Sequence, residues 1–340
     1  MKLYGVPMKV TFEELFSTMR EKLIKHGCPE DIAERSARNL ASSTRDGVKS
    51  HGVYRFTRLV SMIDRGIVKA DMTPECVKSL GALEVWDGKY GVGNTNAEDA
   101  MNRAMELADK YGIGCVAMKN TNHWMRGGAF GIQAAEKGFA SICWTNTIPN
   151  LVPWGAMSKE VGNNPLVMGV PYGDRFVIFD GAMSQFSYGA LDNAIMAGKK
   201  LPVPGGYDKD GNITDDPKEI SESGRMFPTG YWKGSSISIL MDMMLACLAE
   251  GDTVKDIGDR GRSPMDECGL SQIFIALKVS DRSYADSAIA RICDSVKNAV
   301  PAENVKEVYY PSERLFATRE RSMKEGMEIQ DKVWEEIQAL

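Results

Sequence analysis

The spacing of apolar residues changes near residue 70, and this change limits the folds that the chain can adopt. Before residue 70, apolar residues recur every three or four positions, which is typical of amphipathic helices. A Thr11-x-x-Glu14 capping box predicts the start of a first helix. Pro29 is expected to start a second helix and Ser50 to cap a third, which ends at Gly66. The N-terminal region is therefore predicted to be helical.

After residue 70, short runs with the character of strands alternate with helical patterns. Strands are expected at about 82–86, 113–118, 140–145, 167–171, 175–180, 272–279 and 308–310. Helices are expected at about 96–111, 129–137, 236–249, 283–297 and, as closing helices, from 312 to 338. Residues 201–229, rich in Gly, Pro and Asp, are expected to form a long surface loop. This order predicts an α/β fold with a mixed β-sheet between flanking helices.

Two regions follow from this order. Residues 1–70 are expected to form an N-terminal helical region that packs with the C-terminal helices at about 312–340. Residues 71–311 are expected to form the α/β region. The chain carries no Rossmann fingerprint in either. Gly91-Val92-Gly93 lacks the third glycine, and Gly112-Ile113-Gly114 lies between a helix end and a strand, the reverse of a phosphate-binding turn. The residues alone therefore do not predict a dinucleotide site.

Charge and cysteine usage exclude several kinds of partner. The net charge of −5 provides no basic face for nucleic acid, and no run of 18 apolar residues predicts a membrane span. The seven cysteines are dispersed without a Cys-x-x-Cys pair, which is typical of free thiols in a reducing compartment. Because the N-terminus also lacks a signal-peptide core, we expect a cytoplasmic protein. Met1 and Met8 are alternative starts.

His51 and Arg55, at the start of the third helical pattern, are the first candidates for catalysis. Residues four apart share a helix face, so both side chains are expected to project together. An imidazole that moves a proton beside a guanidinium that binds a carboxylate suits a 2-oxo acid. Plainer roles stay open: Ser50 as a cap only, His51 as a structural residue and Arg55 in a surface ion pair. His26, in the last turn of the first helix, is expected to be structural.

Several longer motifs resemble those of the malate/L-lactate dehydrogenase-like oxidoreductases, and the resemblance extends from about Met8 to the C-terminus. They are Ser50-His51-Gly52-Val53 and Asn120-Thr121-Asn122-His123-Trp124-Met125-Arg126-Gly127-Gly128. Further motifs resemble one branch of that family: Cys143-Trp144-Thr145-Asn146, Pro153-Trp154-Gly155, Phe186-Ser187-Tyr188-Gly189 and Gly230-Tyr231-Trp232-Lys233-Gly234. The resemblance implies a non-Rossmann fold of the L-sulfolactate/malate dehydrogenase type. It also implies reduction of a 2-oxo sugar acid, 2,3-diketo-L-gulonate, to 3-keto-L-gulonate by hydride transfer to C2. Malate, lactate, ureidoglycolate and cyclic imino acids are the alternative substrates on this scaffold.

The resemblance also assigns roles to single residues. His51 is implied to be the proton donor, with Ser50 beside it and Asp180 as the carboxylate that orients the ring. A helix N-terminus disfavours the imidazolium, which such a carboxylate would restore. Asp180 fits equally well as a strand-end turn residue. Arg55, Asn122, His123 and Arg126 are expected to bind the substrate, although Arg126 also suits a cofactor phosphate or a salt bridge within its loop.

A nicotinamide cofactor is implied by the resemblance, with NADH expected in preference to NADPH, which no residue excludes. By position, the cofactor contacts fall at Phe176, Val177, Ile178, Phe179, Asp180, Gly181, Ala182, Trp232, Lys233, Ser312, Glu313 and Arg314. Lys233 beside Gly234 suits a phosphate, or a solvated loop lysine. The family more often has glycine where Ser312 stands, so this chain departs from the pattern there.

Other classes of protein are less well supported. A serine hydrolase would need a Gly-x-Ser-x-Gly elbow, which the chain lacks. A metal site would need clustered His, Cys or carboxylate ligands, and the three histidines of this chain are far apart in the sequence, so no metal is expected. A non-catalytic protein that binds sugar acids stays open, because it would keep Arg55 and Arg126 without needing His51 and Asp180 together.

The resemblance further implies a homodimer. Trp residues in or beside predicted loops, and the run Met241, Met243 and Met244 within one helix, fit an interface. Packing in the core explains the methionines equally well.

Overall fold

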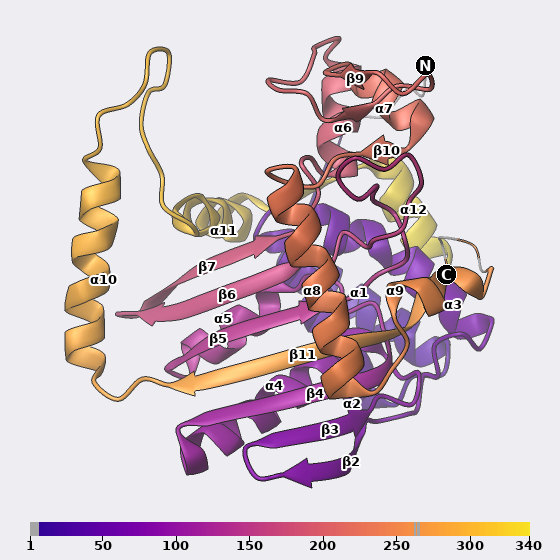
Figure 1. Cartoon of the computed structure of the whole chain (residues 1–340). Coiled ribbons are helices and arrows are strands. Elements are labelled where there is room, and N and C mark those ends of the chain that lie inside the picture. The colour runs from indigo at the N-terminus through magenta and orange to yellow at the C-terminus, as the bar shows by residue number, and fades with distance from the viewer. Residues whose placement is uncertain (1–6, 262, 264–265) are drawn as a thin grey trace.

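The computed structural model describes residues 7–261, 263 and 266–340, so the alternative start at Met1 lies outside the described residues. Its centre is a seven-stranded β-sheet in the order β2-β3-β4-β11-β5-β6-β7 (Figure 1). The strands are β2 (Glu75–Leu80), β3 (Leu83–Asp87), β4 (Ile113–Asn122), β11 (Cys268–Lys278), β5 (Phe139–Thr145), β6 (Leu166–Tyr172) and β7 (Arg175–Gly181). β3 and β4 run parallel and the other neighbours antiparallel, which confirms the predicted mixed sheet.

Helices cover both faces of the sheet (Figure 1). On one face lie α4 (Gly93–Tyr111) and α5 (Gly128–Glu136), which enclose a core around Phe130 and Phe274. On the other face lies α8 (Trp232–Ala249), whose Leu245 shares a buried core with Trp144 of the sheet. The Trp144 indole also donates a hydrogen bond to the Met241 carbonyl at 3.2 Å. Helices therefore bury both faces of the inner strands.

The N-terminal helices form a separate core with the end of the chain. This part contains α1 (Phe12–Lys25), α2 (Glu30–Arg45), α3 (Phe56–Asp64) and α12 (Asp331–Ala339). β1 (Met8–Val10) pairs with β12 (Met327–Ile329), which ties the two ends of the chain together. The Thr11 side chain accepts a hydrogen bond from the Glu14 amide at 3.2 Å, so the predicted N-cap contact of α1 is formed. The boundary at residue 70 stays a prediction.

Three predicted elements differ in the structure. Residues 201–229 contain α7 (Pro217–Ser223) and a small sheet of β8 (Gly206–Tyr207), β9 (Ile213–Thr214) and β10 (Arg225–Met226), beside α6 (Tyr188–Met196). Strands of two residues are too short to give a pattern among the many turn residues of this segment. The start of α7 did have a signal, because Asp216 before Pro217 is typical of a helix N-terminus. Residues 308–310 form no strand, because Tyr309 instead packs under Lys297 and bonds to Glu307.

The third helix starts later than predicted, at Phe56 rather than after Ser50. Two 3-10 turns, Lys49–His51 and Val53–Arg55, precede it. The remaining helices are α9 (Val254–Asp259), α10 (Arg282–Lys297) and α11 (Glu313–Glu325). Figure 1 shows that α10 and the segment after it stand out from the body of the molecule. No helix among the described residues is both long and apolar enough to cross a membrane.

Candidate active site

A cavity of about 330 Å³ lies where the N-terminal turns meet the ends of the central strands. It brings together His51 and Arg55 from the 3-10 turns, His123 and Arg126 from the loop after β4, and Asp180 from β7. These residues come from three distant parts of the sequence and were all predicted to belong to the site. The cavity is also lined by Arg58, Trp124, Met125, Gly127, Thr145, Thr147, Ile148, Asn150, Asn163, Pro165, Tyr188, Glu267 and Leu270.

Gly52 shapes the segment that carries His51. A side chain at Gly52 would place its Cβ 2.8 Å from the Leu40 carbonyl oxygen and closer still to the Thr44 hydroxyl, so only glycine allows this approach to α2. The Thr44 hydroxyl then accepts a hydrogen bond from the Val53 amide at 2.9 Å. This contact breaks the helical path between His51 and Arg55. The predicted shared helix face is therefore wrong, yet both side chains still reach the same cavity.

Ser50 does not cap a helix, contrary to the prediction. Its hydroxyl lies 3.0 Å from His51 Nδ1, so it fixes the ring through a hydrogen bond. Asp180, the expected partner of His51, makes no hydrogen bond to it within the described part of the chain. The Asp180 carboxylate instead accepts a hydrogen bond from the Gly128 amide at 2.8 Å and lies 3.9 Å from Arg126 Nε. The charge of Arg126 draws Asp180 towards the start of α5.

The charges around His51 disfavour its protonated form. Burial, followed by the positive charges of Arg55 and Arg126, lowers the pKa of His51 to about 4. The His123 ring stacks on it, with ring centres 5.8 Å apart. Burial, followed by the charges of Arg55, His51 and Arg58, lowers the pKa of His123 as well. The helix N-terminus was expected to disfavour the protonated His51 ring. In the structure, burial and the nearby guanidinium groups have that effect instead.

We expect His51 to be neutral at pH 7 in the ligand-free protein. With three histidines in the chain, ring C–H resonances can be assigned by substitution and followed by NMR as the pH falls. The midpoint for His51 should lie near 4, because the ring is buried and protonation adds a charge beside Arg55 and Arg126. A midpoint at or above the ordinary histidine value would contradict this electrostatic description.

Of the two predicted substrate contacts at the end of β4 and just after it, Asn122 and His123, only His123 lines the cavity. The Asn122 side chain does not line the cavity, because its amide donates to the Tyr90 and Gly91 carbonyls at 2.8 and 2.7 Å. His123 Nδ1 accepts a hydrogen bond from the Met125 amide at 3.0 Å, in a turn where Met125 has φ of 63°. The prediction that Asn122 contacts the substrate therefore lacks geometric support, whereas His123 faces the cavity.

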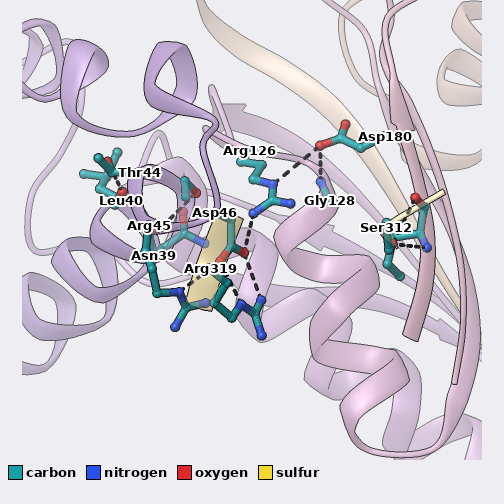
Figure 2. A network of polar contacts seen from close by, with 12 residues as sticks. Asn39, Leu40, Thr44, Arg45, Asp46, Arg126, Gly128, Asp180, Ser312 and Arg319 are labelled. Carbon is teal, nitrogen blue, oxygen red and sulfur yellow. Dashed lines mark hydrogen bonds and ion pairs between the residues drawn. The ribbon is translucent and has the colours of Figure 1, made fainter. Parts of the chain in front are cut away.

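Arg126 is only 5% exposed and joins two carboxylates across the site (Figure 2). Its terminal nitrogen donates to Asp46 at 2.8 Å, and its Nε faces Asp180. Of the three roles that the sequence left open for Arg126, a salt bridge is formed, although with Asp46 rather than within its own loop.

The cavity contains charged residues that no sequence pattern indicated. Glu267 is 7% exposed, and its carboxylate accepts a hydrogen bond from the Ile148 amide at 3.3 Å. Burial raises the pKa of Glu267, and the charges of Arg55 and Arg58 oppose that shift. Thr147, Asn150 and Asn163 form a hydrogen-bonded polar wall. The motif Cys143-Trp144-Thr145-Asn146, at the end of β5, directly precedes Thr147 and was a partial signal for that wall, whereas Glu267 had none.

Hydrogen bonds connect β7, which holds the first predicted cofactor segment (176–182), to the parts of the chain that carry the other two (232–233 and 312–314). The Ser312 hydroxyl accepts a hydrogen bond from the Ile178 amide at 2.8 Å, which seats the start of α11 on the strand. Just after β7, the Met183 carbonyl accepts a hydrogen bond from the Thr229 amide at 2.8 Å, close to Trp232 and Lys233. Ser312 has φ of 74°, a conformation that favours glycine, and its hydrogen bond to β7 compensates for the departure from the family pattern.

Metal chemistry has no support in the described residues, where no group of three or more His, Cys, Asp or Glu side chains is placed to hold an ion. The site is instead a polar cavity with two imidazoles, several guanidinium groups and two carboxylates. Such a set can bind an anion and exchange a proton with it.

Comparison with known proteins links this geometry to a family. The family model for malate/L-lactate dehydrogenase matches residues 10–338. The 2,3-diketo-L-gulonate reductases of Citrobacter koseri and Salmonella paratyphi B are 42% and 43% identical over 336 residues, covering 98% of this chain and 100% of each relative.

Solved structures show the same fold. Sulfolactate dehydrogenase from Methanocaldococcus jannaschii superposes with a TM-score of 0.89 at 26% identity, covering 97% of this chain and 95% of that one. Malate dehydrogenase from Entamoeba histolytica superposes with a TM-score of 0.90 at 24% identity, covering 98% and 97%. The predicted fold type, without a Rossmann fingerprint, is thereby confirmed.

Proposed function

We propose that this chain, an oxidoreductase that belongs to the malate/L-lactate dehydrogenase family, reduces 2,3-diketo-L-gulonate to 3-keto-L-gulonate with NADH. The observation that carries the proposal is the cavity in which His51 and Arg55 face Asp180. The names of the relatives that are 42% identical over their whole length support the substrate. Other 2-oxo acids of the same family are the alternative.

In this proposal, Arg55 binds the substrate carboxylate and His51 gives a proton to the oxygen on C2. The carboxylate brings a negative charge next to His51, which offsets the nearby guanidinium groups and raises its pKa in the complex. Ser50 fixes the His51 ring through Nδ1, so the other ring nitrogen is left for the substrate. Asp180 adds a negative charge to the same cavity and further favours the protonated ring.

A nicotinamide cofactor fits the residues around β7. Lys233 and Arg314 are exposed cations from two of the predicted segments and suit the diphosphate, while Trp232 and Phe179 are exposed apolar surfaces for the rings. Asp180 belongs to both the cofactor segment and the cavity, so the two sites meet there. When bound, the nicotinamide supplies the hydride that reduces C2.

A substrate panel tests this function. The wild-type protein is mixed with NADH or NADPH and with 2,3-diketo-L-gulonate, pyruvate, oxaloacetate or a cyclic imino acid, and the absorbance of the reduced nicotinamide is followed. We expect the highest kcat/KM with the diketo sugar acid and NADH. Binding of these acids without oxidation of either cofactor would favour a non-catalytic sugar-acid-binding protein.

We place the protein in the cytoplasm. None of the seven cysteines forms a disulfide, and four of them, Cys28, Cys143, Cys268 and Cys293, are buried. Free thiols of this kind persist in a reducing compartment.

A homodimer is also proposed, with the outer surface of α8 as part of its interface. Ile237, Leu240 and Met244 are 43%, 58% and 45% exposed and follow one another at helical spacing, and Met243 beside them is 56% exposed. Met241 of the same run is buried, so core packing explains only one of the three methionines. An exposed apolar stripe of this kind is typical of an interface between subunits.

Leu240→Glu should prevent this association, because dimerisation would then bury a carboxylate without a partner. We expect the variant to sediment as a species of about 37 kDa with most activity lost, whereas the wild type sediments at twice that mass. Val77→Glu, at a comparably exposed residue on β2, is the control and should stay dimeric. A fully active wild-type monomer, unchanged on dilution, would show that no dimer is required.

A further inference from the structure

We propose that Asp46 is a positioning residue, which holds the Arg126 guanidinium at the active-site cavity and so controls the charge next to His51 and Asp180. Asp46 lies at the end of α2 and is not part of the cavity lining. The proposal rests on the proposed function only for its effect on turnover. Its effect on the charge of the cavity can be measured without a substrate.

The geometry at Asp46 is that of a buried anion that organises three cations (Figure 2). Asp46 Oδ1 accepts hydrogen bonds from Arg45 Nε at 2.9 Å and from Arg319 Nε at 2.8 Å. Asp46 Oδ2 accepts from Arg319 Nη2 at 2.9 Å and from Arg126 Nη1 at 2.8 Å. Both oxygens are therefore fully used, and the paired contact with Arg319 fixes the plane of the carboxylate.

Burial separates this cluster from an ordinary surface ion pair. The side chains of Asp46 and Arg126 are 1% and 5% exposed, whereas those of Arg45 and Arg319 are 20% and 23% exposed. Burial alone raises the pKa of the Asp46 carboxyl, but the hydrogen bonds from Arg319 and Arg45, with the charge of Arg126, outweigh it and hold the pKa below its ordinary value. The carboxylate therefore stays ionised and paired.

Arg126 is fixed at one end and unsatisfied at the other. Its Nη1 is bonded to Asp46, while its buried Nε has no hydrogen-bond partner among the described residues. Asp180 Oδ2 lies 3.9 Å from this Nε, beyond a hydrogen bond but close enough for a strong charge interaction. A buried donor without a partner costs free energy of folding. We infer that the hydrogen bond to Asp46 keeps Arg126 in this position despite that cost.

Asp46 can act on the reaction only through Arg126. A second cavity, of about 400 Å³, lies on the far side of Arg126 and is lined by Asp46, Arg45 and Arg319, whereas His51 and Asp180 line the first cavity. The Arg126 guanidinium forms the wall between the two. Without the Asp46 charge, Arg45, Arg126 and Arg319 would repel one another, and Arg126 could move into the solvated second cavity.

Titration of His51 by NMR tests this role in the ligand-free protein. Arg126→Gln removes a charge that lowers the pKa of His51, so the His51 midpoint should rise. Asp46→Asn should raise it in the same direction, and should cause no further rise when Arg126 is already Gln. An unchanged or lowered midpoint in Asp46→Asn, or an equal shift in both backgrounds, would overturn the proposal.

Arg35→Gln is the matched control, because Arg35 lines the same second cavity but bonds to Glu98 and Asp99 rather than to Asp46. It should leave the His51 midpoint unchanged. A shift of the same size in this variant would mean that any charge change in the second cavity acts at a distance, and the positioning role would be lost.

Turnover gives a second test, made with whichever 2-oxo acid the wild type reduces. Asp46→Asn should lower kcat about 10- to 100-fold, because a misplaced catalytic environment slows the chemical step more than it weakens binding. In the Arg126→Gln background the same substitution should have little further effect. Additive losses would overturn the proposal, whereas an inactive wild type would overturn only the proposed function, since the titration still reports on Asp46.

Discussion

His51→Asn is expected to lower kcat by roughly 10²–10⁴, the usual contribution of a positioned acid or base. The substitution keeps the size and polarity of the side chain near Ser50 and His123 but removes the group that gives the proton. Binding of the cofactor should persist, because its proposed contacts lie around β7 and the starts of α8 and α11. The measurement is steady-state turnover, with cofactor binding followed separately by fluorescence titration.

His26→Asn is the matched control. His26 bonds to Asp64 and to the Leu340 carbonyl, at 2.6 and 3.3 Å, and does not line the cavity. Its substitution should leave kcat unchanged. Near-normal turnover in both His51→Asn and His51→Ala would remove His51 from the mechanism and direct attention to His123, the other imidazole in the cavity.

Arg55 substitutions should act on the binding of the substrate carboxylate. Arg55→Lys keeps the charge but loses the planar pair of donors, so KM for a 2-oxo acid should rise substantially. Arg55→Met should lower kcat/KM roughly 100-fold, which corresponds to a loss of about 3 kcal/mol of transition-state stabilisation. The substrate carboxylate would then be buried without its charged partner. Glu267, which Arg55 helps to keep ionised, would gain a proton more readily in Arg55→Met.

The amide of the substrate separates a carboxylate contact from a general effect on the fold. In the wild type, the amide should be reduced far more slowly than the acid, and the Arg55→Met substitution should abolish most of that difference. If the amide were reduced as fast as the acid, Arg55 would not bind the carboxylate.

The elements that were predicted from the sequence are those with long and regular apolar patterns. The helix at 93–111 ends at Gly112, whose φ of 82° is the left-handed conformation that glycine favours. The strands at 113–122 and 139–145 contain apolar runs, at 113–118 and 139–144, and most of their residues are buried or half-buried. By contrast, every residue of β2 is exposed, so this edge strand had no apolar face to reveal it.

Five predicted residues, His51, Arg55, His123, Arg126 and Asp180, line the cavity, whereas Glu267 and most of the contacts were not predicted. His51 and Arg55 were expected on one helix face, yet the path between them depends on how tightly Gly52 packs on Thr44, which is a property of the folded chain. Asp46 precedes Gly47, a common turn signal that says nothing of an ion pair, and its main partner Arg319 lies 273 residues away. Such long-range charge pairs leave no periodic signal in a single sequence.

Transfer of deuterium from the cofactor to the substrate tests the central claim most directly. NADH labelled with deuterium at C4, prepared in both stereochemical forms, is mixed with 2,3-diketo-L-gulonate and the wild-type protein, and the product is examined by NMR. The account predicts 3-keto-L-gulonate with deuterium on C2 from one of the two labelled forms. A product that carries the label on C3, or no labelled product from either form, would contradict it.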